Sequence, residues 1–300
     1  MPDLQPIAAI PDVPPRPADA HKGTFGTVII VGGCDTMIGA PALCAAAALR
    51  SGTGLVKIAA PANVLTAALT IEPGATGILI GDDVKTTLHQ LDKADPDHTA
   101  ILAVGPGLGQ SEGAAELVDA LLQGPRAIVL DADGLNLLAH STLTLESIRN
   151  PQSAIRNLPS LVLTPHPGEF RRLAARAHVT ESPTDRLQRP VAAAKLAEAF
   201  RAIVLLKGQY TIASDGSRVF TNATGNPALA TAGSGDVLTG IIASLLAQRM
   251  QAFDAAVLAA HLHGLAADMW SQVHGTSGLT ARDLATILPD AFNVHRTEPR

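Results

Sequence analysis

The sequence predicts an α/β protein with a doubly wound, mostly parallel β-sheet, helices on both faces and a late β-hairpin. Short apolar runs rich in β-branched residues alternate with helical segments between Thr27 and Leu206, the pattern of strand–helix–strand units. Hydrophobic residues make up 47% of the 300 residues and aromatic residues only 3%, so we expect a core of Ala, Val, Leu and Ile, which suits buried parallel strands. Asp215-Gly216, a strong hairpin signal, separates two short β-like runs.

The elements follow in order along the chain. Residues 1–20 hold six of the 21 prolines, so we expect an extended, flexible segment that forms neither a ladder nor a helix easily. One domain then spans residues 21–300, without an internal repeat. Apolar runs that end in turn residues predict strands at 27–31, 55–59, 101–104, 127–130, 161–163 and 202–206, and hairpin strands at 210–213 and 218–221. Helical periodicity predicts helices at about 41–50, 112–122, within 183–200, from 237 onward and at 254–270.

Charge and cysteine content exclude several functional classes. The net charge is −5 and no Lys/Arg block occurs, which argues against a nucleic-acid surface. Cys34 and Cys44 are too few for a disulfide framework and lack zinc-binding spacing. No apolar run reaches the roughly 18 residues that a membrane span needs, and the N-terminus lacks a secretory pattern. We therefore expect a reduced, cytoplasmic protein.

The strongest candidate site is the segment Gly225–Gly240, written GNPALATAGSGDVLTG. Helical periodicity begins at Val237, so Gly233-Ser234-Gly235 lies at a helix N-terminus, where free N–H groups attract anions such as phosphate. Asp236 falls in the first turn, and we expect the helix dipole to keep it ionised and able to accept a proton from a bound hydroxyl. The alternative is an ordinary Gly-rich helix start with no ligand.

Three further loops follow predicted strands. The first is Gly105-Pro106-Gly107-Leu108-Gly109, the second is Thr164-Pro165-His166-Pro167-Gly168-Glu169 and the third is Lys207-Gly208. In the second loop, two prolines fix the backbone of His166. Each loop also has a plain structural interpretation. The first would be a strand-to-helix turn, the second a structural histidine followed by a glutamate that is stabilising in the first turn of the next helix, and the third a solvated lysine. Because the carboxyl ends of parallel strands share one sheet edge, these loops are nevertheless expected to meet there.

Two other groups of polar residues are weaker candidates. Asp131 and Asp133 follow the predicted strand 127–130 and would either contact a metal or cap the next turn. His261 and His263 are two residues apart on a helix and point to different faces, so we interpret them as structural or surface residues. Gly32-Gly33 lacks the spacing of the dinucleotide-binding fingerprint.

Taken in order, these motifs resemble the ADP-dependent NAD(P)H-hydrate dehydratases of the ribokinase-like superfamily. The resemblance runs from His21 to about Leu288 and uses Lys22-Gly23, Gly26 and Gly32-Gly33 together with the loops at 105–109, 164–169, 207–208 and 225–240. It implies one ribokinase-like dehydratase domain. Relatives of this kind often carry an N-terminal epimerase domain, and the length of this chain leads us to expect that a separate protein supplies that activity.

The resemblance implies a lyase that repairs nicotinamide nucleotides. The family removes water from NADH or NADPH hydrated at C6 of the nicotinamide ring, acting on the S epimer, with ADP as co-substrate, AMP and phosphate as products and Mg²⁺ as the expected electrostatic partner. The hydroxyl is first phosphorylated and then leaves as phosphate. A homotetramer is also implied by the resemblance. The choice of ADP over ATP rests on the resemblance alone.

Carried over residue by residue, the resemblance assigns two sets of contacts. Asp236 is implied as the general base, and the hydrated coenzyme is expected to contact Ala40, Gly107, His166 and Asp236. The adenine nucleotide is expected to contact Lys207, Gly208, Gln209, Tyr210, Thr211 and Gly235. No protein metal ligand is implied. The chain departs from the family pattern at Ala228-Leu229, Ala232 and Ser234, and Ala232 adds a Cβ to the anion loop.

Two other functions remain open at this point. A small-molecule kinase of the same superfamily, acting on a vitamin precursor, would use the same aspartate and stop at the phosphorylated product. Hydroxymethylpyrimidine and thiazole kinases tend to carry Gly-Thr-Gly-Cys where this chain has Gly233-Ser234-Gly235-Asp236, which favours the dehydratase. A non-catalytic nucleotide sensor would not need the Asp236 carboxylate beside an anion loop.

Overall fold

Ten strands form one sheet in the computed structural model, which describes residues 4–81, 83–148 and 161–297. Within these residues β9 alone runs antiparallel to its neighbours, and every other adjacent pair is parallel. From one edge to the other the strands are β1 (Gln5–Ile7), β10 (Arg218–Thr221), β9 (Ile212–Ser214), β8 (Ile203–Leu206), β7 (Leu161–Leu163), β6 (Ile128–Leu130), β5 (Ile101–Val104), β2 (Thr27–Val31), β3 (Leu55–Ala60) and β4 (Thr76–Leu79).

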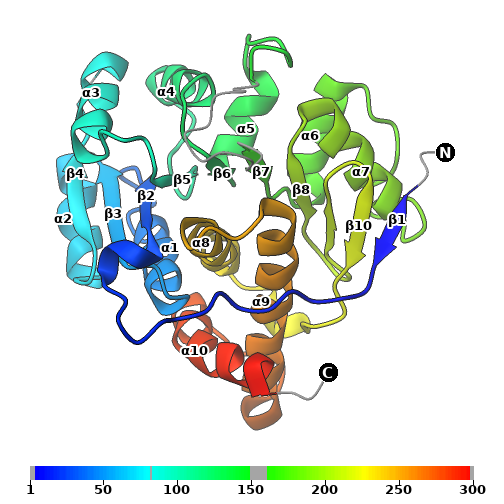
Figure 1. The fold of residues 1–300 in the computed structure, drawn as a ribbon. Helices are drawn as coiled ribbons and strands as arrows, with labels where there is room; N and C mark the ends of the chain where they lie inside the picture. Colours follow the sequence, from blue (N-terminus) through cyan, green and yellow to red (C-terminus); the bar gives the residue numbers. More distant parts are fainter. Residues whose placement is uncertain (1–3, 82, 149–160, 298–300) are drawn as a thin grey trace.

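Helices cover both faces of the sheet because its central strands are apolar on both sides (Figure 1). In β2, Val28 and Ile30 join one core cluster, while Ile29 and Val31 join the other. The first cluster is covered by α1 (Ala40–Arg50), α2 (Ala62–Ile71), α8 (Ser234–Ala247), α9 (Ala252–His274) and α10 (Ala281–Thr297). The second is covered by α3 (Val84–Ala94), α4 (Glu112–Leu122), α5 (Asp133–His140), α6 (Pro167–Ala177) and α7 (Arg189–Phe200).

Helix α8 lies at the centre of the first cluster. Every residue from Val237 to Ala247 is buried, and apart from Thr239 and Ser244 these residues are apolar or glycine, as expected of an enclosed helix. Its neighbour α1 approaches closely at Gly240, where an added Cβ would lie 2.3 Å from the carbonyl oxygen of Cys44. Tight packing on all sides therefore fixes where the N-terminus of α8 points.

The N-terminal segment differs from the expectation of a flexible chain without regular structure. Gln5–Ile7 forms β1 and pairs with β10, and Ile10 and Val13 pack on the core. Farther along, Arg16 donates to the carbonyl oxygen of Gly52 at 2.9 Å. An edge strand needs hydrogen bonds along one side only, so Pro6 is tolerated at a position where a central strand would reject it.

The fold class is confirmed, and the structure adds elements that the sequence did not indicate. Each predicted strand is present to within two residues, as are the predicted helices at 41–50 and 112–122. The strand β4 and the helices α2, α3, α5 and α10 were not predicted. Strand β4 is four residues long and mostly exposed at the sheet edge, so it lacks the apolar run of a buried strand. Among the described residues, no helix has both the length and the apolar character that crossing a bilayer requires.

Candidate active site

The N-terminus of α8 forms a bare backbone loop, as predicted. Gly233 has φ +85°, and a Cβ there would lie 2.7 Å from Leu43 Cδ1 and 2.9 Å from Ala281 Cβ, so both the backbone angle and the packing favour glycine. The Ser234 side chain donates to the carbonyl oxygen of Leu229 at 2.9 Å, which fixes the turn. The N–H groups of Gly235 and Asp236 fall in the first turn, where the helix itself supplies no acceptor. The loop is therefore suited to binding an anion.

The protonation of Asp236 departs from the expectation that the helix dipole keeps it ionised. Burial, reinforced by the negative charge of Asp131, raises the pKa of Asp236 to about 7, and the positive charge of Lys207 offsets this only in part. Desolvation of the carboxylate outweighs the dipole because it acts on the whole charge. A carboxyl group that titrates near neutral pH is well matched to accepting a proton from a hydroxyl.

A buried ion pair lies directly beneath this loop. Lys207, which follows β8, donates from Nζ to Asp131 Oδ1 at 2.6 Å, and the Thr239 hydroxyl of α8 donates to Asp131 Oδ2 at 2.8 Å. A Cβ at Gly235 would lie 3.4 Å from Lys207 Nζ and 3.5 Å from Asp131 Oδ2, so the backbone of the loop passes directly over this pair. Burial alone would lower the pKa of Lys207, but Asp131, Glu169 and Asp236 outweigh it and raise that pKa. Lys207 is therefore a charged and paired group, not a solvated one.

His166 and Glu169 lie beside this pair at the start of α6. His166 Nδ1 accepts from the N–H of Gly168 at 2.9 Å, and Glu169 Oε2 accepts from the N–H of His166 at 2.8 Å, which completes a capping box. Glu169 Oε2 also lies 3.8 Å from Lys207 Nζ. Burial raises the pKa of Glu169 to about 7, and burial together with Lys207 lowers the pKa of His166. The imidazole is therefore neutral and half exposed at the mouth of the site.

Ala40 and Gly107 are brought together on the other side of α8. Gly107 has φ +63°, and a Cβ there would lie 3.0 Å from the Cβ of Ala40 and 2.7 Å from the carbonyl oxygen of Met37. The loop that carries Gly107 is held by Asp133, whose Oδ2 accepts from the N–H of Gly109 at 2.9 Å. Asp133 therefore holds the loop after β5 instead of capping the turn that follows it, where the N-cap residue Ala132 of α5 makes no side-chain hydrogen bond. Among the described residues no group of three or more His, Cys, Asp and Glu is arranged to hold a metal.

The segment Lys207–Thr211 has an exposed outer surface and a buried support. Gly208, Gln209 and Tyr210 are exposed, and the Thr211 hydroxyl donates to the carbonyl oxygen of Gly208 at 2.9 Å. Beneath the segment, the buried guanidinium of Arg189 donates to the carbonyl oxygens of Leu206 at 3.0 Å and Lys207 at 3.3 Å. Sequence reasoning missed Arg189 because an arginine before an Ala-rich helix resembles a solvated end.

His263 supports the site from behind, which fits its structural interpretation. Its Nε2 lies 2.9 Å from the carbonyl oxygen of Ser234, and burial lowers its pKa to about 4, so the ring is neutral. His261 is also buried and packs against His295 at a ring-centroid distance of 5.1 Å. Neither histidine is a surface residue.

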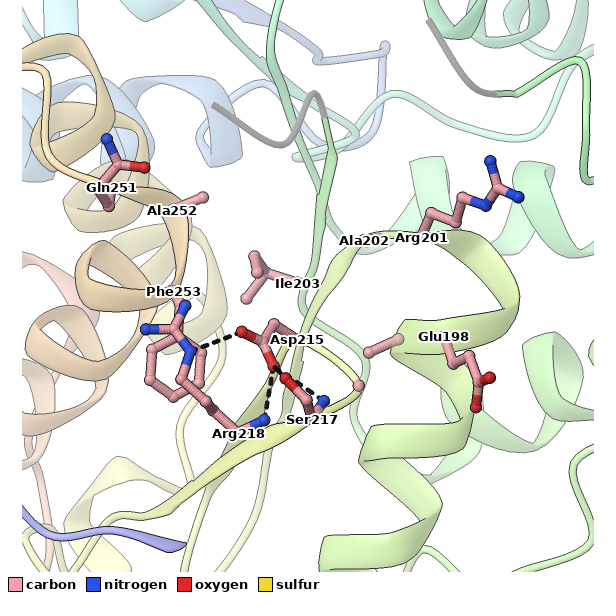
Figure 2. Close-up of a pocket in the computed structure, with 12 residues that line it drawn as sticks. Glu198, Arg201, Ala202, Ile203, Asp215, Ser217, Arg218, Gln251, Ala252 and Phe253 are labelled. Carbon is pink, nitrogen blue, oxygen red and sulfur yellow. Dashed lines mark hydrogen bonds and ion pairs between the residues drawn. The ribbon is translucent and has the colours of Figure 1, made fainter. Parts of the chain in front are cut away.

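Two pockets lie away from Asp236, Lys207 and the glycine loop of α8. One, of about 560 Å³, opens beside Ile203 at the amino end of β8, whereas Lys207 follows the carboxyl end. Figure 2 shows its polar wall, where Arg218 pairs with Asp215 and stacks on Phe253. The other, of about 640 Å³, is lined by β1, β10 and the segments next to them, together with Pro190 and His261. The candidate site is thus defined by its converging polar groups and not by cavity volume.

Comparison with known proteins adds an independent observation. Residues 28–290 match the family model described as NAD(P)H-hydrate dehydratase. The ADP-dependent (S)-NAD(P)H-hydrate dehydratase of Neisseria meningitidis serogroup B is 39% identical over 90% of this chain and 86% of its own length. A solved ADP/ATP-dependent NAD(P)H-hydrate dehydratase of Bacillus subtilis, co-crystallised with ATP and Mg²⁺, is 30% identical, covers 94% of both chains and superposes with a TM-score of 0.76.

Longer relatives match as well. A bifunctional NAD(P)H-hydrate repair enzyme of Moorella thermoacetica is 42% identical over 92% of this chain and 51% of its own length. The chain spans about half the length of the bifunctional relatives it matches.

Proposed function

Because the chain belongs to the NAD(P)H-hydrate dehydratase family, we propose that it dehydrates the S epimer of hydrated NADH and NADPH with ADP, releasing AMP and phosphate. The fold is ribokinase-like. The observation that carries the proposal is the position of Asp236, a carboxyl group with a pKa of about 7, in the first turn of α8 beside Lys207. This arrangement puts a base next to an anion site, which phosphorylation of a hydroxyl requires.

The proposed reaction has two steps. Asp236 takes the proton of the C6 hydroxyl while that oxygen bonds to the β-phosphorus of ADP, and the bond from this phosphorus to the oxygen of AMP breaks. The C6–O bond then breaks, phosphate leaves with the bonding electrons, and loss of a proton from C5 restores the ring double bond. Phosphate is a far better leaving group than hydroxide, and this difference explains the need for the nucleotide.

The residues assigned to each ligand follow from this geometry and from the family resemblance. The N–H groups at Gly235 and Asp236 would stabilise charge on the transferring phosphoryl group, and Lys207 adds a positive charge beneath them. The nucleotide would contact Lys207, Gly208, Gln209, Tyr210, Thr211 and Gly235. The hydrated coenzyme would contact Ala40, Gly107, His166 and Asp236.

A magnesium ion would have to come with the nucleotide. The described residues offer no protein cage for it, and the Asp131 carboxylate already accepts hydrogen bonds from Lys207 and Thr239. Mg²⁺ is commonly held by phosphate oxygens with few protein ligands, and when bound it neutralises phosphate charge. The proposal therefore assigns no metal ligand to the chain.

The setting of the enzyme is part of the same proposal. We propose a cytoplasmic homotetramer that works with an NAD(P)H-hydrate epimerase, which converts the epimer that this site does not accept. The reduced coenzymes that it repairs are small molecules, and its product returns to the coenzyme pool.

The direct test is recovery of reduced coenzyme. Hydrated NADH is incubated with the protein, Mg²⁺ and either ADP or ATP, and the absorbance of NADH is followed while AMP and phosphate are quantified. With ADP we expect absorbance to return with one AMP and one phosphate for each NADH. A vitamin-precursor kinase would instead consume nucleotide only with its own alcohol substrate. No recovery with either nucleotide would refute the dehydratase.

A further inference from the structure

Arg189 carries a buried positive charge that no carboxylate within the described part of the chain neutralises. The buried Arg126, by contrast, donates to Asp95 at 2.7 Å and to Asp92 at 2.9 Å. Arg189 is also the first residue of α7, and a cation at a helix N-terminus is repelled by the dipole. Burial, the lack of a counter-ion and the position at a helix N-terminus each destabilise the charged form of Arg189. Other contacts must therefore stabilise the guanidinium.

Those contacts are four backbone carbonyls. Besides Leu206 and Lys207, the guanidinium donates to Pro183 at 2.6 Å and reaches the carbonyl oxygen of Tyr210 at 3.5 Å. Three of the four acceptors belong to the chain from Leu206 to Tyr210, that is, to the end of β8 and the loop after it. A planar fork with several donors can span them, whereas a point charge such as a lysine ammonium cannot.

The loop that Arg189 supports has an unusual backbone. Gly208 has φ +128° and Tyr210 has φ +55°, a left-handed conformation that is unfavourable for a bulky side chain. A Cβ at Gly208 would lie 3.4 Å from Arg189 Nη1, so the loop runs directly over the guanidinium. Such conformations persist only where the surroundings impose them, and Arg189 supplies the contacts from below.

We propose that Arg189 is a positioning residue that holds the Lys207–Thr211 segment in the conformation that binds the nucleotide. It acts through the backbone that it bonds, and the exposed outer surface of Gly208 and Gln209 is left for the ligand, whereas the Arg186 guanidinium lies over the Tyr210 ring at 4.6 Å from its centroid. Its unneutralised charge beneath the loop also favours an anion above it. The inference rests on the proposed function, because that function assigns the segment to the nucleotide.

Arg176 offers a matched control. It is partly buried, and its guanidinium also donates to three carbonyl oxygens, those of Leu138, Ser141 and Leu143. The loop it supports follows α5 and carries none of the proposed ligand contacts. Losing this arginine removes a comparable set of hydrogen bonds without touching the Lys207–Thr211 segment.

The test compares Arg189→Gln, Arg189→Lys and Arg176→Gln with the wild-type protein. ADP affinity is measured by isothermal titration calorimetry, the KM for hydrated NADH by steady-state kinetics, and Tm by circular dichroism. We expect Arg189→Gln to weaken ADP binding by at least about tenfold, because hydrogen bonds to a charged group are lost. Arg189→Lys should lose less, since the charge remains, and the KM for hydrated NADH should stay within about twofold for both variants.

Three results would overturn the inference. The first is that Arg189→Gln binds ADP within about twofold of wild type. The second is that Arg189→Gln impairs ADP binding and raises the KM for hydrated NADH to the same extent. The third is that Arg176→Gln loses as much ADP affinity as Arg189→Gln. If Arg189→Gln does not fold, Gly208→Ala probes the same loop with Arg189 intact, and normal ADP affinity in that variant refutes the inference. A wild-type protein that binds ADP but does not dehydrate the hydrate refutes the proposed function alone.

Discussion

Replacing Asp236 with Asn is expected to stabilise the ligand-free protein at pH 8, although it removes the proposed base. The carboxyl group is largely buried at the N-terminus of α8, close enough to Asp131 for their charges to repel. Its ionised form is therefore unfavourable in the folded state. Asparagine is neutral and nearly the same shape, so it resembles the protonated acid and removes this unfavourable charge at every pH.

The size of the effect follows from the two pKa values of the group. An aspartate in an unfolded chain titrates near about 3.9, whereas the pKa of Asp236 in the folded protein is about 7. Between these values the folded state keeps a proton that the unfolded state has released, so stability falls as pH rises. Below about pH 4 this group does not lower the free energy of unfolding. By pH 5 it lowers that free energy by about 1.5 kcal/mol, and above pH 7 by at most about 4 kcal/mol. Partial exposure of the side chain makes these upper bounds.

Urea unfolding followed by circular dichroism at pH 5 and pH 8 measures this directly, with the free energy of unfolding extrapolated to water. The gain from Asp236→Asn should be larger at pH 8 than at pH 5. Asp133→Asn is the matched control: its carboxylate accepts hydrogen bonds from Gly109 and Gln110, so this change should be neutral or destabilising at pH 8. A variant at position 236 that is less stable than wild type at pH 8, or equally altered at both pH values, would refute the reasoning.

Three further predictions concern the same site. Asp236→Asn should lower turnover by about 10²–10⁴-fold with ADP affinity retained. In the wild-type protein, kcat/KM should decrease as the pH is lowered through about 7, because Asp236 becomes protonated. Activity that is constant from pH 5 to 8 would contradict this. Asp131→Asn leaves the buried Lys207 ammonium without its nearest carboxylate. It should lower the free energy of unfolding by roughly 3 kcal/mol in the same urea titration. A decrease below about 1 kcal/mol would mean that Glu169 replaces Asp131 as the partner of Lys207. Gly235→Ala makes only ordinary contacts with Lys207 Nζ at 3.4 Å and Asp131 Oδ2 at 3.5 Å, but its Cβ projects into the proposed phosphate loop. It should therefore weaken ADP binding about tenfold by calorimetry. Unchanged affinity would exclude Gly235 from the nucleotide site.

Local patterns in the sequence were enough to place the main strands and the glycine loop. Runs such as Thr27–Val31 are apolar on both faces of the sheet, so their composition reports their burial directly. The loops at Gly105, Thr164 and Lys207 follow such strands, and parallel pairing brings the carboxyl ends together. Topology alone therefore predicted that these loops would converge.

Partnerships between distant residues could not be predicted in this way. Asp131 and Lys207 are far apart in sequence, and nothing near either residue indicates that they form an ion pair. Arg189 resembles a solvated helix end until its four carbonyl partners are known. The pKa of Asp236 depends on desolvation, which is a property of the packed helices around α8 and not of the Gly-Ser-Gly-Asp motif.

The position of β1 has a consequence for how the chain folds. Gln5 pairs with Arg218, so the first strand of the sheet cannot form until most of the chain has been synthesised and β10 is in place. During translation the segment around residues 5–7 must wait unpaired, and its prolines make it a poor partner for other strand edges meanwhile. Such long-range closure raises contact order, which slows folding. Truncating residues 1–10 removes this long-range pairing, so the shortened chain should refold no more slowly than the full chain. Its free energy of unfolding should be lower, because β1 and the packing of Ile7 and Ile10 are lost.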